Sequence, residues 1–367
     1  MRYCFDIETN GFLDDCTTVH CIVLKNIDTN EILKPTNEEA IKLLSEADLI
    51  TGHNIIKFDI PVLEKLFGFK TKAQIFDTIV ATRLLFPDIR DSDFKRNDFP
   101  ANCIGRHSLK AWGYRVGNYK EAFDTDWKTF SPAMLDYCVQ DVEVTHSLFK
   151  MIENRGYSKQ AMELEHDVAQ LIYKQERHGF TFDKEKAEQL YSTLNARRLE
   201  LEDEFQKIFL PITTKRISPK TGKQLKDKVT VFNPSSRLHI AERLQSKYNW
   251  KPEEFTADGK PKLDDTVLSQ LDYPEAKLLA EHFLLDKRIG QLATGAQAWL
   301  KNERNGKIHG TCNTNSTVTA RASHSNPNLG QVPSVSVPYG KDCRSLFTVP
   351  KGKKLVGIDI SGLGIRM

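Results

Sequence analysis

The chain has 367 residues, 40% of them hydrophobic and 28% charged, with a formal net charge of +3. This composition is ordinary for a soluble protein of roughly two or three domains, and such a charge does not by itself identify a nucleic-acid-binding protein. The seven cysteines form no Cys-x-x-Cys pair. That pattern argues against a zinc ribbon or a disulfide framework and predicts reduced thiols in a cytoplasm. No apolar run approaches the length of a membrane span, so no membrane partner is expected.

The first predicted strand covers residues 2–9, with the sequence RYCFDIET. Side chains alternate between the two faces of a strand, so Asp6 and Glu8 point the same way. Two adjacent like charges are unfavourable without a positive partner, and Mg²⁺ or Mn²⁺ prefers oxygen ligands of this kind. From this pair alone, a metal site and a solvated acidic strand edge are equally good interpretations.

The next 150 residues predict an α/β layer structure, because early antiparallel strands give way to alternating helices and strands. Further strands are predicted at 20–24, 31–34, 48–51 and 74–77, and helices at 37–44, about 58–67, 78–85 and from 132 on. Asn37 is predicted to cap its helix. Asp59 falls in the first turns of one helix, and Tyr137 and Asp141 share one face of another.

Each of these residues also has an ordinary interpretation. Tyr137 could be a half-buried tyrosine, and Asp59 could be an exposed acid that favours the helix dipole. Asp77 precedes Thr78 in the manner of a helix cap, so we leave it out of the candidate metal ligands.

Three motifs follow one another in the chain and resemble those of the DEDDy 3′-to-5′ exonucleases. They are D-x-E (Asp6, Glu8), N-x-x-x-F-D (Asn54, Phe58, Asp59) and Y-x-x-x-D (Tyr137, Asp141). The resemblance implies an RNase H-like fold, a mixed five-stranded sheet with helices. It also implies that the four acids, Asp6, Glu8, Asp59 and Asp141, bind two Mg²⁺ (or Mn²⁺) ions about 4 Å apart.

Roles for the remaining motif residues come from the same resemblance. Tyr137 would orient the attacking water, and Asn54 and Phe58 would line the 3′-terminal nucleotide of a single strand. Because tyrosine has the water-orienting role in this pattern, we interpret His53 and His107 as structural or DNA-proximal.

Residues 156–308 are predicted to be mainly helical. A helix from Met162 ends before Gly179, Asp183 caps a second helix over 184–208, and a third helical stretch, 278–300, is interrupted at Gly290 and Gly295. Long antiparallel helices with a loop-rich tip indicate an arm.

Residues 207–228 contain seven basic residues and one acid, Asp227. Pro219 and Gly222 lie inside this segment, which predicts a mobile loop. Contact with a DNA backbone and an ordinary solvated loop are equally good interpretations.

Several phrases resemble the family A DNA polymerases of short-tailed phages: SLKAWGYR at 108–115, KQER at 174–177, VFNPSSR at 231–237 and KRIGQ at 287–291. The resemblance implies a proofreading exonuclease domain at 1–155, a helical linker and thumb at 156–308, and a partial palm at 309–367. Some members carry a long thumb insertion that recruits thioredoxin. Only the short basic loop occupies that place here, so thioredoxin binding is not expected. A phage-encoded chain would act in the host-cell cytoplasm.

The last sixty residues resemble the primer–template segment and the first palm strand of these polymerases. Arg321, Asn328 and Gln331 fall on positions that touch DNA there, and Asp359 on the first polymerase metal ligand. The family has an acid where this chain has Gly364, and the second palm aspartate and the fingers helix are absent. Asp359 alone cannot hold two metal ions, so the chain as written is expected to be truncated within the palm motif and not to polymerise by itself.

Three functional hypotheses remain open. The first is a metal-dependent 3′-to-5′ exonuclease joined to the thumb of a replicative polymerase. The second is a subunit that polymerises only with a separate fingers–palm chain. The third is a non-catalytic DNA-binding remnant, which requires the four carboxylates to diverge in space.

Overall fold

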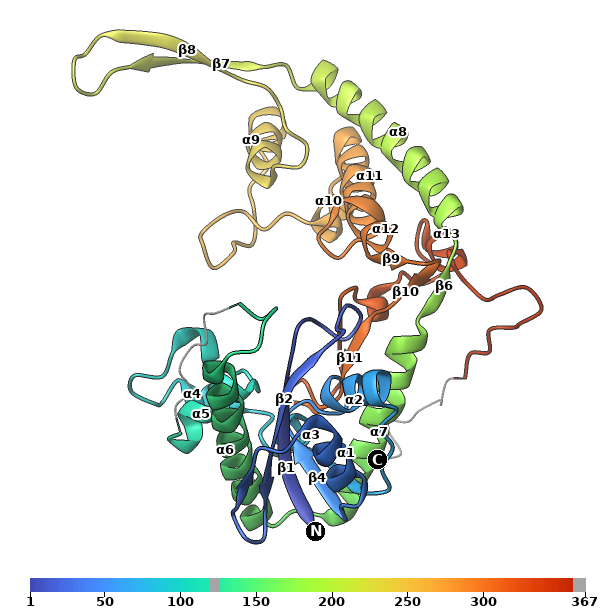
Figure 1. Ribbon diagram of the computed structural model, residues 1–367. Helices are drawn as coiled ribbons and strands as arrows, with labels where there is room; N and C mark the ends of the chain where they lie inside the picture. The colour runs from blue at the N-terminus through green and yellow to red at the C-terminus, as the bar shows by residue number, and fades with distance from the viewer. Residues whose placement is uncertain (119–125, 359–367) are drawn as a thin grey trace. The chain divides into compact units, whose positions relative to one another are not determined.

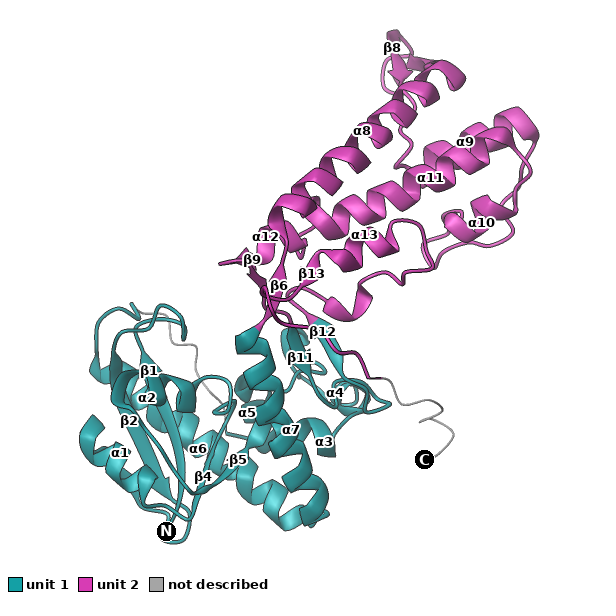
Figure 2. Ribbon diagram, turned by 90° about the vertical axis from the view of Figure 1, so that its right-hand side faces the viewer, with its two compact units in different colours: residues 1–178, 311–324 teal, residues 179–310, 325–367 magenta. Residues whose placement is uncertain are grey.

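The computed structural model describes residues 1–118 and 126–358, which fall into two compact units (Figures 1 and 2). Unit 1 comprises residues 1–178 and 311–324, and unit 2 comprises 179–310 and the described residues from 325 on. A division of the chain into compact units does not test a division into functional domains. The predicted domain boundaries therefore stay a prediction. Among the described helices, none is long and apolar enough to cross a membrane.

A mixed five-stranded sheet forms the centre of unit 1, as the sequence predicts. Its strands follow the order β3-β2-β1-β4-β5. Their bounds are β1 Arg2–Thr9, β2 Val19–Asn26, β3 Ile32–Leu33, β4 Leu49–Gly52 and β5 Gln74–Asp77. The β1–β2 and β2–β3 pairs are antiparallel, whereas β4 runs parallel to both β1 and β5.

Because side chains alternate along β1, the two faces of this sheet pack against different helices. Tyr3, Phe5 and Ile7 pack into the core that includes α1 and α2. Cys4, on the opposite face, packs with Cys138 and Val142 of α6, and Figure 1 shows α6 lying along the sheet. Since Asp6 and Glu8 share the face of Cys4, both acids lie on the side of the sheet that α6 covers.

Four helices of unit 1, α1, α3, α5 and α6, begin at a residue whose side chain caps the helix. The bounds of the helices in this unit are α1 Asn37–Ser45, α2 Asp59–Phe67, α3 Thr78–Leu85, α4 Ile89–Asp93, η1 Ala101–Cys103, α5 Leu109–Val116, α6 Pro132–Arg155 and α7 Lys159–His178. Ser131 caps α6 as predicted. The predicted cap of α1 was wrong: Thr36 caps that helix and forms a capping box with Glu39, because the Glu39 side chain reaches back to the Thr36 N–H.

Unit 2 is built from long helices over a small four-stranded sheet of order β13-β6-β10-β9. Its helices are α8 Lys184–Ile208, α9 Arg237–Tyr248, α10 Asp265–Gln270, α11 Pro274–Ile289, η2 Gly290–Thr294, α12 Trp299–Asn302, η3 Leu329–Gln331 and α13 Gly340–Ser345. Its strands are β6 Phe180–Phe182, β7 Ile212–Ile217, β8 Gln224–Thr230, β9 Glu303–Arg304, β10 Lys307–Ile308 and β13 Phe347–Thr348. Its core joins α8, α9 and α11 through buried residues such as Phe205, Leu244 and Leu285. The predicted arm of long helices is therefore present.

Two further local predictions were wrong. The basic segment is not an irregular loop but an antiparallel hairpin of β7 and β8, whose strands pair from Ile212 with Thr230 to Ile217 with Gln224. Its Thr-, Ile- and Val-containing flanks favour strand, and Pro219 and Gly222 fall in the turn between the strands. The first part of the predicted palm strand, residues 354–358, forms no strand. Its remainder, including Asp359, lies outside the described residues.

The short strands β11 (Thr311–Asn313) and β12 (Ser323–Ser325) pair with each other. Residues 311–324 belong to unit 1 although they follow most of unit 2 in the chain (Figure 2). A late segment of the sequence therefore packs with the first 178 residues.

Candidate metal centre

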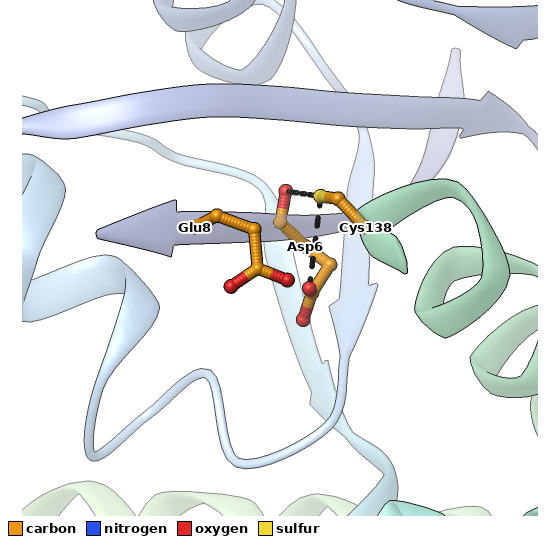
Figure 3. A group of neighbouring side chains, drawn as sticks. All are labelled: Asp6, Glu8 and Cys138. Atoms are coloured by element: carbon orange, nitrogen blue, oxygen red, sulfur yellow. Dashed lines mark hydrogen bonds between the residues drawn. The ribbon is translucent and has the colours of Figure 1, made fainter. Parts of the chain in front are cut away.

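Asp6 and Glu8 lie side by side near the end of β1, together with a thiol that the sequence analysis did not single out. Asp6, Glu8 and Cys138 each offer a ligand atom, and these atoms all lie within 4.8 Å of one another (Figure 3). The Cys138 thiol lies 3.7 Å from Asp6 Oδ2 and 3.5 Å from the Asp6 carbonyl oxygen. Cys138 precedes Asp141 by three residues on α6, so both project towards the same side of that helix.

Asp59 is the first residue of α2 and is buried, with 3% of its surface exposed. β4 pairs only with Arg2, Tyr3 and Cys4 of β1. Beyond that ladder, the Ile7 N–H, between the two acids of β1, lies close enough to the Asp59 carboxylate to favour its charged form and lower its pKa. Burial raises the pKa of Asp59 from 3.8 to about 8, and the nearby carboxylates of Asp77 and Asp141 add to the rise.

Asp141 and Tyr137 both lie on α6, which packs against β1. Asp141 is buried and close enough to Asp59 to raise its pKa. Tyr137 is half-buried, and its ring meets the Trp127 ring edge to face, with 5.8 Å between the ring centroids. The structure therefore brings Asp6, Glu8, Asp59 and Asp141 to one end of β1. Asp59 and Asp141 stand outside the group within 4.8 Å that the described residues contain.

This set of donors fits a hard divalent cation. It consists of carboxylate oxygens, which Mg²⁺ and Mn²⁺ prefer. The raised pKa of Asp59 reflects burial and neighbouring negative charge without a compensating cation. A cation at this position would supply that compensation. The Cys138 thiol is a softer donor, and burial raises its pKa well above the usual value, which keeps it neutral.

The loop between β4 and α2 carries Asn54 and Phe58, and hydrogen bonds to Asp77 hold it in place. The buried Asp77 carboxylate accepts hydrogen bonds from three backbone N–H groups, at 2.8 Å from Asn54, 3.0 Å from Ile56 and 3.0 Å from Ile79. Asp77 is thus the predicted cap of α3, and it also holds this loop. Gly52 permits the turn into the loop, because a Cβ there would lie 2.9 Å from the Phe5 carbonyl oxygen.

A second set of contacts holds the same loop at Lys57. Lys57 Nζ lies 2.8 Å from Glu176 Oε1 on α7 and donates to the Cys312 carbonyl oxygen at 3.2 Å. Glu176 Oε1 also accepts a hydrogen bond from the Cys312 N–H at 2.6 Å. Next to it, Arg83 donates to the Asn313 side chain at 3.1 Å. Segment 311–324 is therefore tied to the residue that precedes Phe58.

The predicted DNA-contacting residues of the late segment lie in different units. Arg321 is exposed in the turn between β11 and β12, in unit 1. Asn328 precedes η3 and Gln331 is its last residue, in unit 2, where both line a shallow hollow of about 260 Å³ with Gly290 and Gln291. Gln291 donates to the Gln331 carbonyl oxygen at 3.2 Å.

The sequence analysis missed three features of this region. Cys138 could have been found, because its spacing from Asp141 places it on the acidic face of α6. The second role of Asp77 and the Lys57–Glu176–Cys312 anchor depend on contacts between distant segments, which no local pattern reveals. His53 has a structural contact, with Nδ1 at 2.8 Å from the Thr78 hydroxyl.

Comparisons with known proteins agree with this architecture. The chain is 33% identical to the DNA-directed DNA polymerases of Escherichia phage T7 and Enterobacteria phage T3, over 98% of this chain and 68% of each relative. A shorter match, 28% identical, covers 37% of this chain and 15% of DNA polymerase I of Pseudomonas aeruginosa.

Among solved structures, the POL domain of Pol1 from M. smegmatis, in complex with DNA primer-template and dNTP, has the same fold. It matches with a TM-score of 0.62 and 17% identity over 96% of this chain. This chain spans 55% of the length of that one. The model of the family described as DNA polymerase family A matches residues 212–367. With a third of its residues shared with the phage T7 enzyme over two thirds of that enzyme's length, the chain belongs to DNA polymerase family A.

Proposed function

We propose that this chain contains the 3′-to-5′ proofreading exonuclease of a family A DNA polymerase, acting in DNA replication. The observation that carries the proposal is the meeting of acids from three elements: Asp59 of α2 lies near the β1 backbone between Asp6 and Glu8, and Asp141 of α6 lies near Asp59. A remnant without catalysis would have no reason to bring these carboxylates together, three of them buried (Glu8, Asp59 and Asp141), because their mutual repulsion is unfavourable.

In this proposal Asp6, Glu8, Asp59 and Asp141 would hold two Mg²⁺ or Mn²⁺ ions. Such ions lower the pKa of an attacking water and stabilise the oxygen that leaves the phosphorus. The Tyr137 hydroxyl would orient that water, and contact with the Trp127 ring limits the freedom of the tyrosine ring. The domain would comprise residues 1–155.

The substrate of this site would be the 3′ end of a single DNA strand, lined by Asn54 and Phe58. The loop that carries both residues is held at Asp77 and at Lys57, so it is positioned before the substrate arrives. Such preorganisation reduces the free energy needed to order the site on binding. Arg321, Asn328 and Gln331 are proposed to contact the DNA backbone of a primer–template.

The test uses the full chain, a 3′-labelled single strand and Mg²⁺. The wild-type chain should shorten the strand from its 3′ end, and Asp6→Ala should lower the rate by at least a hundredfold, because removing a metal ligand removes the metal's contribution. Asp167→Ala, at an exposed acid of α7, is the matched control and should keep full activity. Degradation that survives Asp6→Ala would refute the assignment of the ligands.

A second readout does not need catalysis. A cation that binds only the folded chain raises its unfolding temperature. Mg²⁺ should therefore stabilise the wild-type chain and the Asp167→Ala variant but not Asp6→Ala. If neither stabilisation nor cleavage occurs in the wild-type chain, the non-catalytic alternative is favoured.

A second candidate function is that of a subunit in a split polymerase, completed by a separate fingers–palm chain. Leu355, Val356 and Ile358 favour it, since these apolar side chains are 64%, 76% and 89% exposed. Apolar surface of this kind is more stable when another protein covers it. Asp359 would then supply the first polymerase metal ligand. Primer extension that appears only on mixing the two chains would support this function, and extension by neither chain nor mixture would reject it.

A further inference from the structure

The segment just before α6 exposes two aromatic side chains, and neither belongs to the three sequence motifs of the proposed nuclease. Trp127 is 39% exposed and Phe130 is 48% exposed. The other tryptophans of the chain are at most 9% exposed: Trp112, Trp250 and Trp299. Single exposed apolar residues are common on protein surfaces. These two, however, lie three positions apart in a segment that contacts the proposed nuclease site.

The backbone that carries Trp127 is held by hydrogen bonds on both sides. The Asp126 side chain accepts a hydrogen bond from the Lys128 N–H at 3.0 Å, which closes a turn with Trp127 at its centre. His20 Nε2, on β2, donates to the Trp127 carbonyl oxygen at 3.0 Å. A ring presented by a fixed backbone loses little conformational freedom when it binds a ligand.

The Trp127 ring connects this exposed segment to the candidate metal centre. It meets the Tyr137 ring edge to face, with 79° between the ring planes and 5.8 Å between the centroids. The residue after Tyr137 is Cys138, whose thiol lies 3.7 Å from Asp6 Oδ2. A ligand on the exposed part of Trp127 would therefore lie next to the residue that is proposed to orient the attacking water.

The surroundings of the two aromatic rings suit a nucleic acid strand with unpaired bases. Phe130 lines a hollow of about 280 Å³ together with His20 and Lys34. Lys34 and Lys128 are both exposed. Proteins that hold single strands combine positive side chains, which follow the phosphates, with aromatic side chains, on which the bases stack. The bases of a duplex are already stacked on one another, so only an unpaired base can occupy such a ring.

We propose that Trp127 stacks on a base of the single strand whose 3′ end enters the nuclease site, and that this contact gives the site its preference for unpaired DNA. The inference deepens the proposed function and takes the identity of the strand from it. Because the stacked ring contacts Tyr137, strand binding and the position of the Tyr137 ring are coupled.

The experiment measures strand binding by the full chain in EDTA, which removes divalent cations and prevents cleavage. One probe is a short oligothymidylate, and the other is an abasic strand of the same length, which keeps the sugar–phosphate backbone but has no bases. Affinities come from the anisotropy of a labelled strand. Acrylamide quenching of the intrinsic fluorescence reports on Trp127 itself, because the other tryptophans are buried.

Three variants are compared with the wild-type chain. Trp127→Ala removes the ring, whereas Trp127→Phe keeps a flat aromatic surface. Tyr157→Ala is the matched control, because Tyr157 is a 49% exposed aromatic residue that lies beyond the opposite end of α6.

The wild-type chain should bind the oligothymidylate at least about tenfold more tightly than the abasic strand, since stacking on one aromatic side chain contributes a factor of this size. The oligothymidylate should also protect Trp127 from acrylamide. Trp127→Ala should reduce the preference for bases about tenfold and leave the affinity for the abasic strand unchanged. Trp127→Phe should keep most of the preference, and Tyr157→Ala should keep all of it.

Two results would overturn the inference. One is an unchanged preference for bases in Trp127→Ala. The other is an equal loss of affinity for both strands, which would mean that the ring supports the fold and does not touch a base. A chain that shows the base preference but no cleavage with Mg²⁺ would reject only the proposed nuclease. A nuclease that cleaves normally but lacks the Trp127 preference would reject only this inference.

Discussion

Charged side chains are used in opposite ways in the loop after β4 and in the β7–β8 hairpin. In the loop, the charged groups that fix the backbone are buried or partly buried and have fixed partners. Asp77 accepts hydrogen bonds from three N–H groups, and Lys57 forms an ion pair with Glu176. In the hairpin, six cations face solvent without a partner among the described residues. Buried charges of the first kind determine structure, because leaving one unsatisfied is costly. Exposed charges of the second kind contribute little to folding and are available to a ligand.

The largest expected effect on stability comes from Asp77. Asp77→Ala leaves the N–H groups of Asn54, Ile56 and Ile79 without their acceptor. Each unsatisfied buried donor costs roughly 1–3 kcal/mol, so the variant should lose about 4 kcal/mol in free energy of unfolding. Urea denaturation measures this loss. Nuclease activity should fall too, although Asp77 is not a proposed metal ligand, because the loop with Asn54 and Phe58 loses its support.

The control for Asp77 is Asp167→Ala, at an exposed acid of the same unit. Exposed substitutions away from special features usually change stability by less than about 0.5 kcal/mol. Equal losses in the two variants would show that the Asp77 carboxylate does not organise the loop.

The next effect comes from the buried ion pair between Asp93 and Arg115, whose closest atoms are 2.7 Å apart and whose side chains are 1% and 3% exposed. Removing one partner of such a pair costs about 3 kcal/mol, so Asp93→Asn should be destabilised by that amount at neutral pH. Burial alone favours the neutral acid, but hydrogen bonds from Arg115 and Gly105 lower the pKa of Asp93 below 3.8.

This lowered pKa predicts a pH dependence with a definite sign. The folded state keeps Asp93 charged at pH values where the unfolded chain takes up a proton. Its stabilisation is therefore complete above about pH 4 and is lost as the pH falls through the folded-state pKa. Free energies of unfolding measured from about pH 5 to about pH 2 should fall less steeply in Asp93→Asn than in the wild-type chain. Parallel curves would contradict the assignment.

A smaller effect is expected at the anchor between Lys57, Glu176 and Cys312. Glu176→Ala removes the acceptor of the Cys312 N–H and the partner of Lys57. The expected loss is about 1–2 kcal/mol, because the Lys57 and Glu176 side chains are 25% and 15% exposed. A double-mutant cycle with Lys57→Met tests the coupling, since the paired losses should not add. Additive losses would mean that the two residues act independently.

The parts of the fold that the sequence predicted correctly depend on local signals. The bounds of α3 follow from the Asp77–Thr78 step, the start of α6 from Ser131–Pro132, and the end of α2 from Gly68, which adopts a positive φ of 65°. The alternation along β1 predicted that Asp6 and Glu8 face the same side. These features need only neighbouring residues, so periodicity and capping rules suffice.

The parts that the sequence could not predict depend on long-range contacts. Nothing near Cys312 indicates that its backbone binds Glu176, which lies 136 residues earlier. The hairpin was missed for a different reason, because Pro219, Gly222 and the lysines outweighed the short β-branched stretches at 212–217 and 229–231. The candidate metal ligands were found early only because they follow a known family pattern, since spacing alone left Asp59 and Tyr137 with ordinary interpretations.

The smallest expected effect on stability is the most useful test of the opening contrast. Replacing Lys215, Lys223, Lys226 and Lys228 with Gln removes four exposed charges that have no described partners. The free energy of unfolding should change by less than about 0.5 kcal/mol, and it should rise if it changes, because mutual repulsion decreases. Urea denaturation of the full chain measures this change, and a variant with Arg at the same four positions is the control. A loss of about 2 kcal/mol or more would mean that these lysines stabilise the structure as Asp77 does. The contrast between charges that stabilise the fold and exposed charges that contribute little to it would then not apply to this hairpin.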